Sequence, residues 1–233
     1  MEPMNLPLLY DLDPDQLSAW LAERGQPRFR ARQVLEWAYQ HNASSFEGMT
    51  NLPRVLRSLL AESFALGPIL PKAIARGQDA TKLLLPMPAG GYVECVRIRM
   101  RNTYTACLSC QVGCPIGCTF CATGRSGCER SLTAGEILAQ LVTLRSTLVG
   151  DGPGAQESLT WTPVPPHTDK FPEDKPSSAA TAPPGPVSLQ VSNVVFMGMG
   201  EPFANYANVV RAIRTMTDPR ALGMSPSRIT VST

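Results

Sequence analysis

The chain carries three cysteines within eight residues, in the run Cys114-Pro-Ile-Gly-Cys118-Thr-Phe-Cys121. Thiolates are the usual protein ligands of iron–sulfur clusters, and three of them this close together can bind three irons of a 4Fe-4S cluster. The fourth iron then has no protein ligand and can bind a substrate, whereas a cluster held by four cysteines only transfers electrons. We therefore predict that Cys114, Cys118 and Cys121 hold a cluster that takes part in chemistry.

Two other uses of these cysteines are compatible with the sequence. A C-x2-C-x7-C-x2-C pattern, made by Cys107 and Cys110 with Cys118 and Cys121, could bind zinc, although zinc ribbons usually separate their pairs by a longer segment. A fourth cysteine, Cys107, Cys110 or Cys128, could complete a ferredoxin-type cluster. For Cys110 and Cys128 we expect small buried side chains, because free cysteine packs as a small hydrophobic residue.

A second motif, Gly198-Met-Gly-Glu201-Pro202, directly follows the apolar segment Val191 to Met197. That segment has the composition of a buried strand, and ligand groups in α/β proteins lie at the carboxyl ends of strands. Glycine allows the backbone to come close to a ligand. Because the carboxylate of Glu201 and nearby carbonyls could accept hydrogen bonds from the ammonium group of a methionine, we expect this turn to bind such a ligand.

The segments around these motifs alternate between strand and helix patterns, which is typical of a parallel α/β sheet. Thr133-Ala-Gly-Glu136 is a capping box that begins an apolar stripe running through Ile137 to Leu148. Parallel strands are buried on both faces, yet the last predicted strand has no covering helix after it. We therefore expect an N-terminal piece of a longer protein, with about half of an α/β barrel. The predicted order is strand 105–109, helix from 133, strand 191–197, helix 205–217 and strand 228–232.

The first 70 residues carry helical patterns instead. Asp13-Pro14, with Gln16 at the third helical position, predicts a capped helix start, and Gly25 predicts its end. A basic turn, Arg28-Phe-Arg-Ala-Arg32, separates the first two helices and is either a solvated surface or a phosphate contact. The apolar stripes of the three helices are Leu17, Trp20 and Leu21; Val34, Leu35, Trp37 and Ala38; and Val55, Leu56, Leu59 and Leu60.

Residues 73–100 change to the period of strands. Val96, Ile98 and Met100 alternate with Arg97 and Arg99, and Thr81 to Leu85 is a second strand candidate with a turn at Gly90-Gly91 between the two. Glu94 lies inside this strand region. A carboxylate in a strand is usually no more than a surface group, so the pattern alone does not assign Glu94 a role.

Composition limits the remaining classes. Nine of the 22 prolines lie between 150 and 186, so we expect a disordered insert there. There is no run of about 18 apolar residues that could span a membrane. Met1 is followed by Glu2 and prolines rather than by a basic and then an apolar stretch, so no signal peptide is expected. The net charge of +2 neither requires nor excludes nucleic acid as a partner.

Taken with their neighbours, the motifs closely resemble the radical S-adenosylmethionine (SAM) RNA adenine-C2 methyltransferases of the RlmN family. The resemblance covers most of residues 5–149 and 190–233. It implies three regions: a helical, RNA-binding accessory domain at 1–70, a β-rich connecting segment at 71–104, and an incomplete radical SAM (βα)6-type barrel at 105–233, cut after about three strands and interrupted by the insert at 150–186. The segments that carry it are Phe29-Arg-Ala-Arg-Gln, Met49-Thr-Asn-Leu-Pro53, Ala106-Cys-Leu-Ser-Cys-Gln-Val-Gly-Cys114, Cys118-Thr-Phe-Cys-Ala-Thr-Gly124 and Val195-Phe-Met-Gly-Met-Gly-Glu-Pro202.

The resemblance also implies a reaction. Such enzymes methylate carbon 2 of an adenosine in 23S rRNA and in certain tRNAs. Because this carbon is not nucleophilic, one SAM first methylates a cysteine near the C-terminus. A second SAM, bound to the open iron of the 4Fe-4S cluster, gives a 5′-deoxyadenosyl radical that activates the methyl group. The methyl-carrying cysteine has no counterpart in this chain, so the chain alone is expected not to methylate RNA.

By position, the family's other functional residues fall on five residues of this chain. Gly200, Glu201 and Ser232 match SAM-binding positions. Glu94 matches the proton acceptor, and Cys107 matches the cysteine that releases the RNA through a transient disulfide. A thiol with a low pKa near cationic groups would suit that release, and we expect five arginines to provide the positive charge or to contact RNA phosphates. These arginines are Arg97, Arg99, Arg101, Arg125 and Arg130, with only Glu129 opposing them.

The expected partners are 23S rRNA, tRNA and an electron donor such as flavodoxin. A monomer in the cytoplasm, with no membrane contact, is expected. Two alternatives stay open: a methyltransferase that acts on carbon 8 of the same adenine with the same parts, and a non-catalytic RNA-binding module built on zinc or a cluster.

Overall fold

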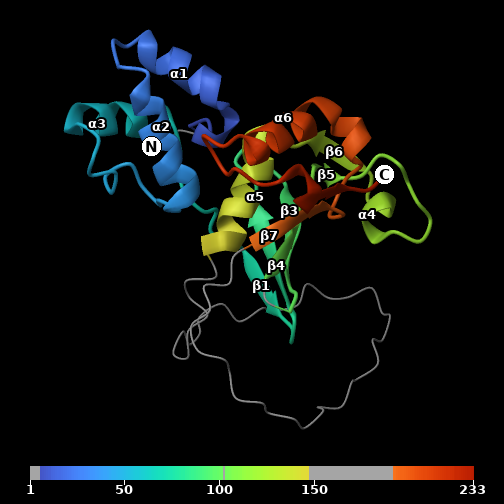
Figure 1. Cartoon of the computed structure of the whole chain (residues 1–233). Coiled ribbons are helices and arrows are strands. Elements are labelled where there is room, and N and C mark those ends of the chain that lie inside the picture. Colours follow the sequence, from blue (N-terminus) through green and yellow to red (C-terminus); the bar gives the residue numbers. More distant parts are fainter. Residues whose placement is uncertain (1–5, 102, 147–190) are drawn as a thin grey trace.

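The structure is a computed structural model that describes residues 6–101, 103–146 and 191–233. The Pro-rich insert expected at 150–186, and with it Leu148, lies outside the described residues. A six-stranded mixed sheet in the order β1-β2-β3-β4-β7-β8 forms the centre of the molecule, and a separate group of helices lies at one end (Figure 1). The α/β class predicted from the sequence is confirmed as a partial sheet. The part of the chain that the structure describes does not close into a barrel.

The parallel half of the sheet follows the predicted rhythm. β4 (Tyr104–Cys107) pairs in parallel with β7 (Val191–Phe196), and β7 pairs in parallel with β8 (Ile229–Val231). The crossovers are α5 (Ala134–Ser146) and α6 (Tyr206–Thr217), which pack against each other. Because α5 also contacts β3 and the N-terminal segment, every residue from Ala134 to Leu144 is buried. The capping box of α5 is confirmed, since Glu136 N donates to Thr133 Oγ1 and Thr133 N donates to Glu136 Oε2.

The antiparallel half extends the same sheet through β1 (Ala73–Arg76), β2 (Ala80–Pro86) and β3 (Tyr92–Arg99). The two predicted strands are present, and the turn at Gly90-Gly91 has positive φ at both glycines. The buried face of β3 is not the Val96, Ile98 and Met100 face, because the register sets Leu83 and Leu85 against Cys95 and Val93. The core face is therefore that of Val93, Cys95 and Arg97.

The N-terminal helices are α1 (Pro14–Ala22), α2 (Phe29–Leu35), which continues as a π-helical turn, η2 (Glu36–Gln40), and α3 (Arg54–Ser63). The predicted start of α1 is confirmed: Asp13 Oδ1 accepts from Gln16 N at 2.8 Å, and Gln16 Oε1 accepts from Asp13 N at 3.1 Å. The apolar stripe predicted for α3 is wrong at Val55, which is 81% exposed because it lies on the outer side of the helix. None of the described helices is long and apolar enough to cross a lipid bilayer.

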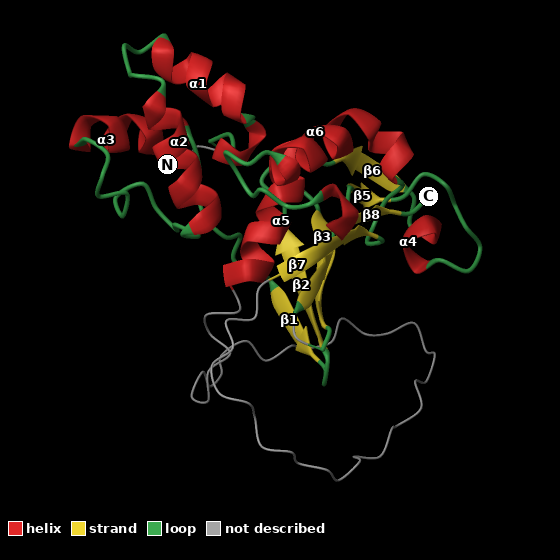
Figure 2. Ribbon diagram, viewed as in Figure 1, coloured by secondary structure: helices red, strands yellow, loops and turns green. Residues whose placement is uncertain are grey.

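The N-terminal helices lie on the side of α5 and α6 (Figure 2). Polar contacts join them to α5, to α6 and to the segment after α6. Asp11, at the end of the short helix η1 (Leu9–Asp11), accepts through Oδ1 from the backbone N–H of Gly135 at 2.8 Å and so caps α5. Its carbonyl accepts from Arg211 of α6. The guanidinium of Arg220 bridges Asp15 of α1, at 2.6 Å, and Asp218, at 2.8 Å, which lowers the pKa of both carboxyls.

Candidate functional site

The cysteine-bearing segment after β4 is built on a small hairpin. β5 (Gln111–Gly113) pairs antiparallel with β6 (Cys128–Ser131), and the short helix α4 (Ala122–Arg125) lies between them in sequence. This hairpin was not predicted, since the sequence pattern indicated only a loop. Gly113 makes the close pairing possible: its φ is +81°, and a Cβ placed there would lie 2.0 Å from the carbonyl oxygen of Gly127. Cys114 N then donates to Gly127 O at 2.8 Å.

The loop between β5 and β6 carries the three motif cysteines, all partly exposed. The pKa of Cys121 is lowered because the backbone N–H groups of Gly124 and Thr123 donate to its sulfur, and Arg125 adds positive charge nearby. That favours a thiolate, the form that binds metal. In the described part of the chain, no group of three or more His, Cys, Asp or Glu side chains is close enough together to hold a metal ion. The sulfur atoms of Cys114, Cys118 and Cys121 are therefore not gathered in this structure. By type and number, three free thiols on one loop still fit a cluster with three thiolate ligands.

The Gly-Glu-Pro turn lies directly against the residues that follow β4. Gly198 N donates to Leu108 O, and a Cβ on Gly198 would lie 2.6 Å from Ser109 Oγ. Gly200 has a φ of +100°, and a Cβ there would lie 2.7 Å from Gln111 N. The glycines predicted from the sequence to allow close approach to a ligand therefore allow, in this structure, close approach of one loop to the other.

The side chain of Glu201 stands at the start of the short helix η3 (Pro202–Asn205). Its Oε1 accepts from Phe203 N at 3.0 Å, and its own backbone N–H donates to Gln111 Oε1 at 2.9 Å. Asn205, at the end of η3, donates to the carbonyls of Cys110 and Leu132, both at 2.8 Å. The carboxylate is thus fixed at the carboxyl end of β7, beside the hairpin that carries the cysteines.

Ser109 links three strands at this edge of the sheet. Its hydroxyl donates to the carbonyl of Glu94 on β3 at 2.5 Å and accepts from Met199 N at 2.7 Å. The backbone N–H and C=O of Ser109 are both bound by the side-chain amide of Gln140 on α5, each at 2.9 Å. Ser109, Gln140 and Asn205 were not predicted from the sequence, since an isolated polar residue in a buried segment has no recognisable spacing.

We expect Ser109→Ala to destabilise the protein by about 1–3 kcal/mol, because the buried hydroxyl joins two backbone groups that would then lack a partner. Chemical denaturation followed by circular dichroism measures the change. Ser63→Ala is the matched control: its hydroxyl donates to Leu59 O within α3, and its loss should change stability by no more than about 0.5 kcal/mol. Equal effects of the two substitutions would show that Ser109 does not hold the edge together.

Glu94, predicted to be the proton acceptor, is half-exposed on β3. One of its carboxylate oxygens forms an ion pair of 2.9 Å with Nζ of Lys82 on β2, and its backbone is tied to the Gly-Glu-Pro turn through Ser109.

Cys107 ends β4 and is 9% exposed. Burial raises the pKa of its thiol, partly offset by a hydrogen bond from the backbone of Met197. The expectation of a low-pKa thiol among cationic groups is therefore wrong for Cys107 in this structure.

Two of the five arginines expected around the cysteines have other contacts. Arg97 is 4% exposed and lies over the ring of Tyr104 at 4.8 Å. Arg130 forms a two-pronged ion pair with the buried Glu136, at 2.7 and 2.8 Å, which raises its pKa. Cys110 is buried as predicted, but the same prediction is wrong for Cys128, which is exposed because it begins β6, a strand whose residues are mostly exposed.

The carboxyl ends of β4, β7 and β8 lie at the same edge, because the three strands run parallel. Cys107, the 198–201 turn and the exposed Ser232 therefore share this edge, and the cysteine hairpin leaves from it. Ligand sites of open α/β sheets form at such an edge. The structure thus brings the predicted site residues to one end of the sheet. All seven cysteines are free.

Comparisons with known proteins show what this chain is related to. Among solved structures, a radical SAM methyltransferase from Sphaerobacter thermophilus superposes with a TM-score of 0.78 at 34% identity, over 97% of this chain and 57% of that protein. Residues 8–66 match the family described as the ribosomal RNA large subunit methyltransferase N-terminal domain. In fold and sequence the chain is therefore related to the radical SAM methyltransferases.

Comparison with curated protein sequences makes the relationship more specific. The dual-specificity RNA methyltransferase RlmN of Nitratidesulfovibrio vulgaris is 40% identical over 232 residues, covering 97% of this chain and 54% of that protein. A probable RlmN of Rhodopirellula baltica is 38% identical over 220 residues, covering 94% and 49%. The chain is thus a homologue of the RlmN methyltransferases, as its motifs predicted, and it spans about half the length of the curated relatives it matches.

Proposed function

We propose that the protein to which this chain belongs is a radical SAM RNA methyltransferase that methylates carbon 2 of adenosine in 23S rRNA and in certain tRNAs through a methyl-cysteine intermediate. The observation that carries the proposal is the shared edge of the sheet, where the three-cysteine hairpin lies against the Gly-Glu-Pro turn. The likeness to RlmN proteins over 94–97% of the chain supports the same activity.

In this proposal Cys114, Cys118 and Cys121 hold a 4Fe-4S cluster. When bound, such a cluster supplies an open iron to SAM and the electron that cleaves it. The residues of the chain do the remaining work. Glu201, which is fixed by Gln111 and at the start of η3, and the backbone at Gly200 bind the amino group of SAM. Ser232, directly after the neighbouring strand β8, takes part in the same binding. These groups orient the cofactor at the carboxyl edge.

Two further residues act after the methyl group has been added to the ring: Glu94 removes the ring proton, and Cys107 releases the product. Glu94 accepts the proton from the adenine ring, and its ion pair of 2.9 Å with the Lys82 ammonium fixes the position of the carboxylate. Cys107 resolves the protein–RNA adduct by forming a disulfide. Burial raises the pKa of Cys107 and so favours its protonated thiol. Because the thiolate is the form that reacts, Cys107 must lose its proton when the partner cysteine approaches. Residues 1–70 serve as the RNA-binding accessory domain, and the electron comes from a donor such as flavodoxin.

The test is reductive cleavage of SAM. We expect the chain, reconstituted anaerobically with iron and sulfide and given a strong reductant, to convert SAM to 5′-deoxyadenosine and methionine, both measured by mass spectrometry. Glu201→Gln removes the charge that binds the ammonium group and should raise the SAM concentration needed. A colourless protein that binds zinc and leaves SAM intact would instead favour a non-catalytic RNA-binding module.

A further inference from the structure

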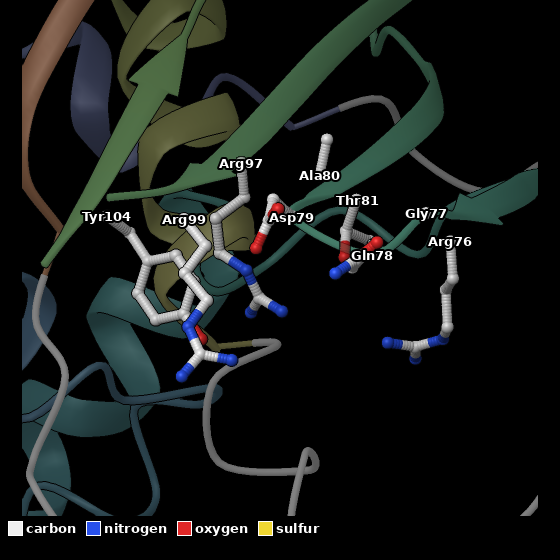
Figure 3. Close-up of a pocket in the computed structure, with 9 residues that line it drawn as sticks. All are labelled: Arg76, Gly77, Gln78, Asp79, Ala80, Thr81, Arg97, Arg99 and Tyr104. Carbon is white, nitrogen blue, oxygen red and sulfur yellow. The ribbon is translucent and has the colours of Figure 1, made fainter. Parts of the chain in front are cut away.

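A basic hollow of about 340 Å³ lies at the other end of the sheet from the proposed active site. It is lined by the turn between β1 and β2 and by the adjoining ends of β3 and β4 (Figure 3). Tyr104 begins β4 and pairs with Val191 at the start of β7, so the hollow lies at the amino ends of the parallel strands. Nothing in the proposed reaction uses this place.

The strand register explains why the charges gather there. Arg76 is the partner of Thr81, and Thr81 is the partner of Arg97, so three neighbouring strands bring these side chains to the same face. Arg99, two residues after Arg97 and paired with Tyr104, is on that face too. Further along the strands the same face carries Leu83, Leu85, Val93 and Cys95 of the core. At its end the core face therefore changes from apolar side chains to arginines.

The hollow is positively charged and partly pre-organised. Its lining includes three guanidinium groups and one carboxylate, that of Asp79, which gives a formal charge of +2. Figure 3 shows the guanidinium groups of Arg97 and Arg99 reaching into the same space, with Arg76 across it. The ring of Tyr104 lies 4.8 Å from the Arg97 guanidinium and restricts its position.

We propose that this hollow binds a phosphate of an RNA backbone, and so positions the RNA at a distance from the reacting adenosine; the choice of RNA rests on the proposed function. Guanidinium groups match phosphate oxygens with two parallel hydrogen bonds. The lining offers no apolar surface on which a nucleobase could stack, because Ala80 is small and Arg97 already covers the ring of Tyr104. A backbone phosphate, which carries no base to recognise, fits this better than a free nucleotide.

The test is the salt dependence of RNA binding. Fluorescence anisotropy with a labelled RNA stem-loop, repeated over a range of KCl concentrations, gives the slope of log K against log salt, and each phosphate contact contributes roughly 0.7–0.9 to that slope. We expect the exposed pair Arg76→Gln with Arg99→Gln to reduce the slope by about 0.7–0.9, because the contact with one phosphate is lost. Arg214→Gln, an exposed arginine on α6, is the matched control and should leave the slope unchanged. Asp79→Asn should tighten binding.

An unchanged slope in the double variant, with an unchanged melting curve, would overturn the phosphate site. Pyrophosphate that bound more tightly than the RNA would also overturn it, because the hollow would then serve a small phosphate. The two proposals fail separately. If the chain cleaves SAM but the Arg76 and Arg99 substitutions leave the salt slope of RNA binding unchanged, the proposed function stands and this site is rejected. A chain that shows the slope change without SAM cleavage keeps the site and loses the proposed function.

Discussion

Cys118→Ala is expected to abolish formation of the iron–sulfur cluster. The wild-type chain, reconstituted anaerobically, should turn brown and bind about four irons, because three thiolates on one loop can hold such a cluster. With one of the three removed, only two ligands remain, and iron and colour should fall close to zero. Visible absorption together with iron and sulfide analysis measures the loss.

Cys128→Ala is the matched control for that experiment. Cys128 is exposed at the start of β6, and Gly113, the residue before Cys114, pairs with it across the hairpin. We expect this variant to keep the full iron content and colour, since the motif does not include it. Equal loss in the two variants would mean that the ligand set is not Cys114, Cys118 and Cys121.

Gly113→Ala is expected to cost about 3 kcal/mol or more in the free energy of unfolding and to reduce cluster loading. Two costs combine at this residue: its φ is +81°, and the added Cβ would lie 2.0 Å from the carbonyl of Gly127. Because that contact is with backbone, the hairpin must open, and Cys114 would lose its hydrogen bond to Gly127 O. Chemical denaturation and iron content give the two readouts.

Gly117→Ala separates the steric cost from the backbone cost. Gly117 is in the same loop with a φ of +69°, but a Cβ there meets no atom within 4 Å. We expect about 1–2 kcal/mol from the backbone conformation alone, and cluster loading close to that of wild type. If Gly113→Ala were no worse than Gly117→Ala, the close pairing of β5 and β6 would not be what holds the cysteine loop.

The sequence was most informative where local patterns are strong. The capping boxes at Asp13 and Thr133 and the apolar runs after them predicted α1 and α5 correctly, because caps and stripes are set by residues a few positions apart. The Gly-Glu-Pro turn was also placed correctly at the end of a strand, because it directly follows an apolar run in the sequence. The resemblance to a known family then connected this turn with the cysteines, which no local pattern does.

Contacts between distant residues were not predictable in this way. The sequence pattern suggests a surface charge at Arg97, but the register with β2 turns this side chain to the core face, where the ring of Tyr104 covers it. The strands β5 and β6 are only three and four residues long, too short for an alternating pattern. Ser109 holds Glu94 and Met199 together by hydrogen bonds across 15 and 90 residues of sequence.

The most direct test is Mössbauer spectroscopy of the anaerobically reconstituted chain, enriched in iron-57, before and after SAM is added. Three cysteine ligands leave one iron open, so we predict that about a quarter of the iron signal changes its isomer shift when SAM binds, while the rest stays as it was. A spectrum in which all the irons are alike and unaffected by SAM, or a protein that takes up zinc and no iron, would contradict the account.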